Sequence, residues 1–213
     1  MSIKPPKEWT TWFFSDPHFG HKAVIDFCDR PFKDIEEMNE TIIKNWNKLV
    51  RPEDLCIFVG DVFFYYSKNE AKKLLSRMNG RKILVRGNHD TKPRAMMNIG
   101  FEICVEQMEM LIANERVTIS HFPFRWSKYK HNWHTFKNRI RNIFSKRKRS
   151  ADKLYSKRPE NKGQFLIHGH THSKEKVNGK MIHVGVDAWN FRPVNIQEIS
   201  NIIDKIRKSE KQK

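Results

Sequence analysis

The spacing of apolar residues in the first half of the chain alternates between two patterns, one typical of strands and one of helices. Continuous apolar runs at Trp12–Phe14, Leu55–Val59 and Ile83–Val85 are short, as strands covered on both faces are. Between them, apolar side chains recur every third or fourth residue, which predicts helices with one buried face. The two helical stripes consist of Ile35, Met38, Ile42, Trp46 and Leu49, and of Ala71, Leu74, Leu75 and Met78. This order of elements favours parallel βαβ units.

Polar residues mark where the predicted helices begin. Asp34, with Glu37 three residues later, has the arrangement of a helix N-cap and its returning carboxylate. The second helix is expected from about Asn69 to Met78. Asn195 and Glu198 repeat the capping pattern and open a final helix. The apolar face of this final helix consists of Ile196, Ile199, Ile203 and Ile206.

Shorter segments after Asp90 predict a second, partly antiparallel set of strands. These segments lie near Ile103–Val105, Glu109–Ala113, Arg116–Ser120 and Gln164–Ile167. Asn178-Gly179 is typical of a two-residue hairpin turn, so Glu175–Val177 and Met181–Val184 are expected to pair. The fold class predicted from these patterns is α/β with an α+β character: a two-sheet mixed β-sandwich flanked by helices.

Five short polar strings each follow an apolar run directly, where a strand would end. They are Asp16-Pro17-His18, Gly60-Asp61, Gly87-Asn88-His89-Asp90, Ser120-His121 and Gly169-His170-Thr171-His172. In α/β sheets, the loops after the carboxyl ends of the strands converge at one edge. Carboxylate, carboxamide and imidazole groups are ligands for divalent metals of borderline hardness. The strings together predict a metal site, although one of them alone would be interpreted as a turn or a helix cap.

In this order, the five strings resemble the pattern of the calcineurin-like metallophosphoesterase family, which reads D-x-H, G-D, G-N-H-[DE], H and G-H-x-H. The resemblance runs from Phe13 to His172. It implies the four-layer architecture of that family, a compact member of the bacterial or phage type, and a centre of two divalent cations. Mn²⁺ is the first expectation, and Fe, Zn or Ni would also suit the mixed nitrogen and oxygen ligands.

The resemblance also implies which residues bind the cations. The ligands carried over by motif are Asp16, His18 and His172 for one cation, Asn88, His121 and His170 for the other, and Asp61 as the bridge between them. Two cations ~3.5–4 Å apart clamp a phosphoryl group, and a hydroxide shared between them would be the nucleophile. His121 is chosen over His131 and His134 because it directly ends the strand predicted at Arg116–Ser120.

Residues beside the ligand Asn88 resemble the proton-transfer group of the family. His89 would donate a proton to the leaving oxygen or stabilise charge on the phosphoryl group. Asp90 would fix the tautomer of His89 and raise its basicity. Gly87 would permit the backbone turn that aims its neighbours at the cations. His21 has two interpretations of equal weight, as a contact to the substrate phosphate or as a cap of the following helix.

The net charge of +17 is concentrated in one segment. Residues 125–163 contain fourteen Lys or Arg and only two acidic residues, a net charge of +12, whereas the rest of the chain carries +5. We interpret this segment as a basic cap inserted between the fourth and fifth strings. Substrate contacts are expected at Lys146, Arg147, Lys148 and Arg149. The aromatic residues of the segment either stack on nucleic-acid bases or pack a helix onto the core, and both interpretations stay open.

Length and composition indicate one domain. We assign residues 1–208 to it and expect the charged tail at 209–213 to be disordered. No apolar run approaches the ~18 residues of a membrane span. The segment Met1–Thr11 has no apolar signal-peptide core, so a cytoplasmic location is the default expectation. The three cysteines, Cys28, Cys56 and Cys104, do not indicate a disulfide framework.

The resulting functional prediction is a dinuclear phosphoesterase. It would hydrolyse phosphomonoesters or phosphodiesters, expected to be those of nucleotides or nucleic acids, by attack of the bridging hydroxide with His89 as the acid. A protein phosphatase is the alternative among enzymes, and a nucleic-acid-binding module with a structural metal site is the alternative from another class. The pair His89-Asp90 argues against the binding module, because a structural site needs no acid beside its ligands. The sequence does not indicate an oligomeric state.

Overall fold

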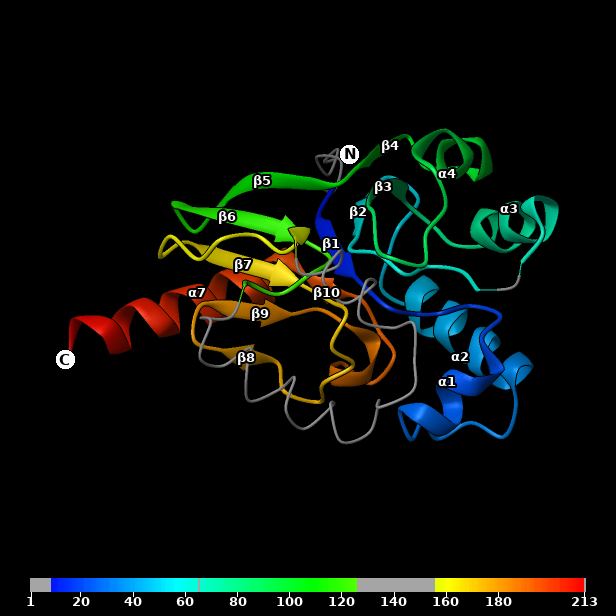
Figure 1. Cartoon of the computed structure of the whole chain (residues 1–213), viewed down its shortest axis with the longest axis horizontal. Helices are drawn as coiled ribbons and strands as arrows, with labels where there is room; N and C mark the ends of the chain where they lie inside the picture. Colours follow the sequence, from blue (N-terminus) through cyan, green and yellow to red (C-terminus); the bar gives the residue numbers. More distant parts are fainter. Residues whose placement is uncertain (1–8, 65, 126–155, 213) are drawn as a thin grey trace, which may run out of the picture.

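In the part of the chain that the structure describes, the strands form two five-stranded mixed sheets with helices around them (Figure 1). The structure is a computed structural model that describes residues 9–64, 66–125 and 156–212. The predicted architecture, a two-sheet mixed sandwich flanked by helices, is therefore confirmed. The run Lys146–Arg149 and the aromatic helix expected around it lie outside the described residues.

The first sheet contains the three apolar runs that were predicted to be parallel strands. Its order is β10-β1-β2-β3-β4, parallel from β1 to β4, with β10 antiparallel at the edge. The bounds are β10 (Val194–Asn195), β1 (Thr11–Phe14), β2 (Leu55–Phe58), β3 (Arg81–Val85) and β4 (Ile103–Val105). Side chains alternate between its faces, so Phe13 and Ile57 pack toward the second sheet, whereas Phe14 and Phe58 pack under helices.

The second sheet combines the later strands in the order β5-β6-β7-β9-β8. The bounds are β5 (Gln107–Ile112), β6 (Glu115–Ser120), β7 (Phe165–His168), β8 (Val177–Asn178) and β9 (Met181–His183). β6, β7 and β9 are parallel, and β5 and β8 pair antiparallel at the two edges. The predicted hairpin is present, but Asn178 still pairs with Met181, so its turn lies at Gly179 and Lys180. Gly179 supplies the positive φ, 58°, that this tight turn requires.

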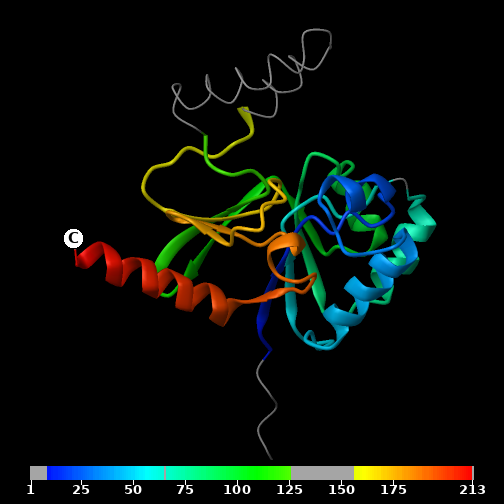
Figure 2. The ribbon, with the colours of Figure 1, turned by 90° about the horizontal axis from the view of Figure 1, so that it is seen from below.

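Among the helices of the described residues, four cover the face of the first sheet that points away from the second sheet, and a fifth lies on the other side (Figure 2). The covering helices are α1 (Lys22–Phe27), α2 (Ile35–Asn47), α3 (Lys68–Ser76) and α4 (Pro93–Ile99). The fifth helix, α7 (Ile196–Lys211), inserts Ile199 and Ile203 into the buried cluster between the sheets. None of the described helices is long and apolar enough to span a bilayer.

Helix capping follows the sequence closely, with small shifts. The Asp34 side chain accepts a hydrogen bond from the backbone N–H of Glu37 at 2.8 Å, and Asn195 with Glu198 forms a complete capping box. The α3 helix begins at Lys68 rather than Asn69, because Ser67 supplies the N-cap. The tail expected to be disordered from residue 209 is helical up to residue 211. An ion pair between Lys180 and Glu210 at 3.2 Å and the basic residues of the last turn favour this extension.

Candidate metal centre

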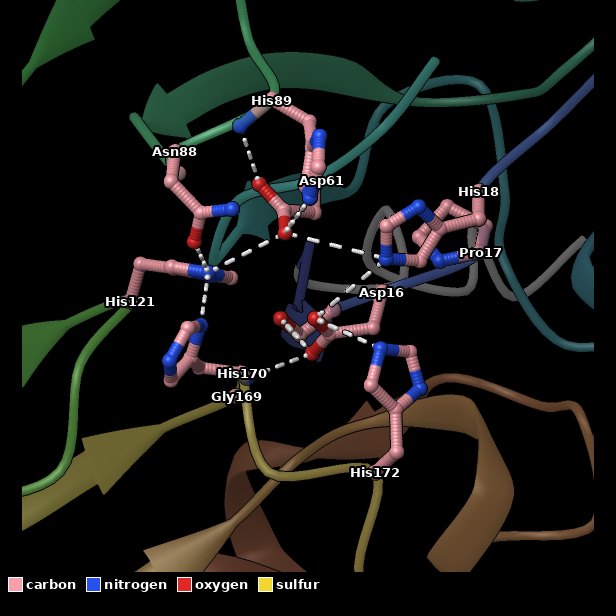
Figure 3. Close-up of polar contacts among 12 residues, drawn as sticks. Asp16, Pro17, His18, Asp61, Asn88, His89, His121, Gly169, His170 and His172 are labelled. Atoms are coloured by element: carbon pink, nitrogen blue, oxygen red, sulfur yellow. Dashed lines mark hydrogen bonds and ion pairs between the residues drawn. The ribbon is translucent and has the colours of Figure 1, made fainter. Parts of the chain in front are cut away.

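The five polar strings meet in space because each one leaves the carboxyl end of a strand. Asp16 and His18 follow β1, Asp61 follows β2, and Asn88 follows β3 in the first sheet, and His121, His170 and His172 follow β6 and β7 in the second sheet. Figure 3 shows Asp61 between His18 and His172 on one side and Asn88, His121 and His170 on the other. All seven predicted ligands are therefore gathered at one edge of the sandwich.

The first group of donors consists of Asp16, His18 and His172, each of which offers one atom within 4.8 Å of the others. The Asp16 Oδ1 atom lies 4.0 Å from His18 Nε2 and 3.9 Å from His172 Nε2. A carboxylate oxygen and two imidazole nitrogens at this spacing surround a space of the size that a cation needs. This group matches the first ligand set expected from the sequence.

The second group consists of Asp61, His121 and His170, again within 4.8 Å of one another. Asn88 joins this group, because its Oδ1 lies 3.1 Å from His121 Nε2. The same nitrogen of His121 lies 3.2 Å from His170 Nδ1 and 3.3 Å from Asp61 Oδ2. The alternatives His131 and His134 lie outside the described residues.

Unpartnered polar atoms at the first group indicate that the residues fit a cation. Asp16 Oδ1 and both ring nitrogens of His18 are buried and have no hydrogen-bond partner in the described part of the chain. A buried polar group without a partner is unfavourable by about 1–3 kcal/mol, so such atoms are rarely left unsatisfied in native proteins. A divalent cation bound by carboxylate oxygen and imidazole nitrogen would satisfy Asp16 Oδ1 and His18 Nε2 together.

The electrostatics of the centre favour negative carboxylates. Burial alone would raise the pKa of Asp16. The nearby His121 and His172 outweigh this effect, so the pKa is lower than usual. The pKa of Asp61 is likewise lowered despite its burial, chiefly by His121. Burial lowers the pKa of His18 to about 4, which favours the neutral ring that a cation requires. Two ionised carboxylates therefore stand among these imidazoles.

The backbone at the ligands is unusual. Asp16, His18, Asp61, His170 and His172 all have positive φ values, between 49° and 69°, in a region that residues with a side chain seldom occupy. Such conformations cost of order 1–3 kcal/mol each and persist only where surrounding contacts enforce them. The ligand loops are therefore held by specific partners.

One such set of contacts, the pairing of Arg30 with Asp187 beside His172, was not predicted from the sequence. Asp187 accepts a hydrogen bond from His172 Nδ1 at 2.9 Å, which leaves Nε2 of this ring for a cation. The Arg30 guanidinium donates to Asp187 at 2.8 and 3.0 Å, and to the backbone carbonyls of Asp16 at 2.8 Å and Pro17 at 2.9 Å. Arg30 is only 4% exposed. This buried pair therefore contacts the backbone or side chain of ligands from two separate strings.

Asp90 does not have the contacts that were expected of it. Its carboxylate accepts hydrogen bonds from the backbone N–H groups of Asp61 at 2.9 Å, Val62 at 2.9 Å and Gly87 at 2.8 Å. Three backbone donors thus occupy the oxygens of Asp90, and these donors belong to the ligand loops. The expectation that Asp90 fixes the tautomer of His89 is therefore wrong. Burial, and then the nearby Asp61, raise the pKa of Asp90 above its usual value, although the N–H groups of Val62 and Gly87 oppose this shift.

Gly87 also acts differently from the expectation. Its φ is not positive, so it does not supply a special turn. A Cβ atom at this position would collide with the Asp61 carboxylate, and one at Gly169 would collide with the side chains of Ser15 and Asp16. These two glycines therefore allow the loops to approach the ligands closely.

The two remaining histidines of interest lie at the rim of the centre. The His89 side chain is 40% exposed, with Nε2 at 4.0 Å from Asp61 Oδ2. His21 stands at the N-cap position of α1, but its side chain makes no capping hydrogen bond to that helix. Its ring is stacked on Phe64, with 3.9 Å between the ring centroids. The expectation that the His21 side chain caps the following helix is therefore wrong, and a contact to the substrate phosphate is the interpretation that stays a prediction.

Comparisons with known proteins agree with this geometry. An uncharacterised protein of Methanocaldococcus jannaschii is 32% identical and covers 91% of each chain. The gene 66 protein of Mycobacterium phage L5 is 30% identical over 94% of this chain and 97% of its own. A solved structure of an Aquifex aeolicus protein of unknown function shares the fold, with a TM-score of 0.61 and 22% identity over 92% of this chain and 100% of its own.

The family comparison covers most of the chain. The model of the calcineurin-like phosphoesterases matches residues 10–201, which include every predicted ligand and both sheets. Members of this family bind divalent metals, and the two donor groups described above are candidates for holding them. The protein is therefore a member of the calcineurin-like phosphoesterase family, a group of metal-dependent phosphoric ester hydrolases.

Proposed function

We propose that this phosphoesterase is dinuclear and acts on esters of nucleotides or nucleic acids, with His89 as the general acid. The observation that carries the dinuclear part is the position of Asp61. Its Oδ2 atom lies 3.3 Å from His121 Nε2 and 3.7 Å from His18 Nε2, although these two rings belong to different donor groups. A carboxylate within reach of both groups suits a bridging ligand, because two adjacent cations repel each other without an anion between them.

The donor sets support a specific division of the ligands. One cation would be held by Asp16, His18 and His172, the other by Asn88, His121 and His170, and both by Asp61. When bound, the cations would supply Lewis acidity and activate a water molecule for attack on phosphorus. Mn²⁺ remains the first expectation, with Fe, Zn and Ni as alternatives.

His89 is proposed as the acid because it combines a fixed backbone with an accessible ring. Its backbone N–H donates to Asp61 Oδ1 at 2.8 Å, which places it directly beside the proposed bridge. Its side chain is 40% exposed, whereas those of the ligands His18, His121 and His172 are 3%, 0% and 24% exposed. His89 is therefore the ring best placed to reach a leaving oxygen that projects from the centre.

Replacing His89 with Ala tests this assignment. We expect the metal content to stay close to that of the unmodified protein, and kcat to fall by ~10²–10⁴-fold, the usual contribution of general acid catalysis. The loss should be smaller for an aryl ester, whose leaving group needs little protonation, than for an alkyl ester of the same phosphate. Equal losses of kcat for the two esters would contradict the acid role. They would indicate that His89 stabilises charge on the phosphoryl group instead.

The substrate part of the proposal is supported by charge. The segment 125–163 carries a net charge of +12, which attracts polyanions. Replacing Lys146, Arg147, Lys148 and Arg149 with Gln should weaken oligonucleotide binding and flatten the slope of log K against log salt by about 2.8, since each single-strand phosphate contact contributes ~0.7.

A matched control separates local contacts from net charge. Lys44 in α2, Lys48 at its C-cap, and Lys205 and Lys208 in α7 are exposed and far from this segment in sequence. Replacing these four with Gln changes the net charge by the same amount, and the salt slope should change little. If both quadruple variants have the same slope, or if the first keeps the slope of the unmodified protein, the nucleic-acid part of the proposal loses its support.

A further inference from the structure

A pocket of about 200 Å³ connects the candidate metal centre to helix α1. On one side it is lined by ligands from both donor groups, and by His89. On the other side it is lined by His21, Val24, Phe27 and Cys28, none of which belongs to the two donor groups described above. A phosphate bound at the centre would have its ester group directed along this pocket or out of it, so this second side is where substrate recognition is expected.

Phe27 is the most conspicuous residue of that second side. It is 80% exposed, the largest exposed fraction among the large hydrophobic side chains of the described chain. Leaving a Phe in water forgoes about 1.5–3 kcal/mol of burial free energy, and the other residues of this kind do not line the pocket. The side chain therefore presents an unused flat apolar surface at the rim of the pocket.

Further aromatic rings lie between Phe27 and the centre. His21 lies 6.5 Å from Phe27 between ring centroids, and stacks on Phe64 at 3.9 Å with an angle of 21° between the ring planes. Phe64 in turn meets the His89 ring edge-on at 5.0 Å. A chain of aromatic groups thus runs from the exposed Phe27 to the residue proposed as the acid.

We propose that Phe27, His21 and Phe64 form a stacking subsite for the base of a nucleotide whose phosphate lies at the metal centre. This inference rests on the proposed function and narrows its substrate class to esters that carry a nucleobase. Flat heterocycles stack on aromatic side chains with little dependence on base identity, and each stacked base contributes ~1–3 kcal/mol. The subsite would hold the base without reading its sequence.

The test uses two esters that release the same group. The p-nitrophenyl ester of thymidine 5′-phosphate carries a base, whereas methyl p-nitrophenyl phosphate does not, and both are diesters that release p-nitrophenolate. With added Mn²⁺, the unmodified enzyme should have a lower KM for the thymidine ester. In the Phe27→Ala variant, the ratio of the two KM values should shrink by ~5–150-fold, which is the stacking contribution of ~1–3 kcal/mol expressed as a ratio.

Two further variants sharpen the test. Phe27→Trp retains a flat surface and should preserve the ratio. Leu111→Ala removes an apolar side chain of similar exposure, 72%, that does not line the pocket, and should also leave the ratio unchanged. A ratio that is the same in Phe27→Ala and in the unmodified enzyme would overturn the subsite.

The failure of the subsite is distinguishable from the failure of the proposed function. If the unmodified enzyme hydrolyses neither ester with any of the candidate metals, the proposed function fails, and the subsite is then judged by calorimetric binding of thymidine 5′-phosphate. Binding weakened by Phe27→Ala supports the subsite, and unchanged binding overturns it. Faster hydrolysis of a phosphotyrosine peptide than of the thymidine ester would also overturn it, because the ring of the substrate would then be that of a protein side chain.

Discussion

The two halves of the candidate metal centre are held in place by opposite charges. The half that contains His18 and His172 is organised by the Arg30 guanidinium, which donates to backbone carbonyls. The half that contains Asn88 is organised by the Asp90 carboxylate, which accepts from backbone N–H groups. The Arg30–Asp187 pair in one half and the single Asp90 carboxylate in the other each contact two ligand loops. The chain thus enforces its left-handed ligand conformations with a few long-range contacts.

The difference between the halves lies in how the imidazoles are oriented. His172 donates to a carboxylate, that of Asp187, at 2.9 Å, whereas His121 Nδ1 contacts a backbone carbonyl, that of Val59, at 2.8 Å. Carboxylates and carbonyls are the usual second partners of metal-binding histidines, and both fix the ring and its tautomer. The Asp187 carboxylate adds negative charge beside His172. It belongs to a side chain, so a substitution can remove it, whereas the Val59 carbonyl beside His121 belongs to the backbone and stays in any variant.

Removing the group that both halves share should have the largest effect. Asp61→Ala should abolish hydrolysis and lower the metal content from about two per chain, because both cations would lose their common anion. The measurement is metal analysis of the purified variant alongside turnover of an aryl phosphate ester. Asp204→Ala removes an exposed carboxylate from α7 and serves as the control. Full metal occupancy with normal turnover in Asp61→Ala would contradict the assignment of Asp61 as the bridging ligand.

Asp187→Asn should separate the halves. The amide retains the shape of the side chain but weakens its contacts to His172 and Arg30, so affinity for one cation should fall by ~10–100-fold, as is typical for such supporting residues. Affinity for the other cation should change much less. Calorimetric titration of the metal-free protein with Mn²⁺ would resolve two binding steps and show which one weakens.

Asp54→Asn is the matched control for this variant. Asp54 has a buried side chain hydrogen-bonded to an arginine, Arg51, at 2.9 Å, but it precedes β2, at the end opposite to the metal centre. Its replacement should lower stability without altering either binding step. Equal weakening of both steps by Asp187→Asn would mean that the two halves are not held independently.

The sequence predicted the residues of the short strings better than the long-range contacts that support them. That the seven candidate ligands lie close together was predictable, because each belongs to a short polar string that follows a strand. The pairing of Arg30 with Asp187 was not predictable, because a single arginine in a loop carries no local signal and its partner lies 157 residues away. Asp90 was noticed for its position beside His89, but its hydrogen bonds depend on the packing of two loops. Helix α4 carried no recognisable period over its seven residues.

The smallest effect on cation affinity is expected from Asp90→Asn, since this carboxylate accepts hydrogen bonds from the backbone of the ligand loops. The amide would place an N–H₂ group against backbone N–H donors of Asp61, Val62 or Gly87, and leaving one such buried donor unsatisfied costs about 1–3 kcal/mol. The free energy of unfolding of the metal-free protein, measured in urea, should fall by this amount.

A control variant and added Mn²⁺ show whether the effect of Asp90→Asn is one of stability alone. Asp34→Asn changes an exposed N-cap where Asn caps equally well, so its unfolding free energy should stay within about 0.5 kcal/mol of the unmodified protein. Cations bind only the folded state, and at a free concentration of 100 times Kd they add ~2.7 kcal/mol. Mn²⁺ should therefore restore most of the stability that Asp90→Asn loses. A variant that is fully stable without metal but binds it 100-fold more weakly would show that Asp90 supports the ligands directly, as Asp187 does, and the contrast between the two halves would disappear.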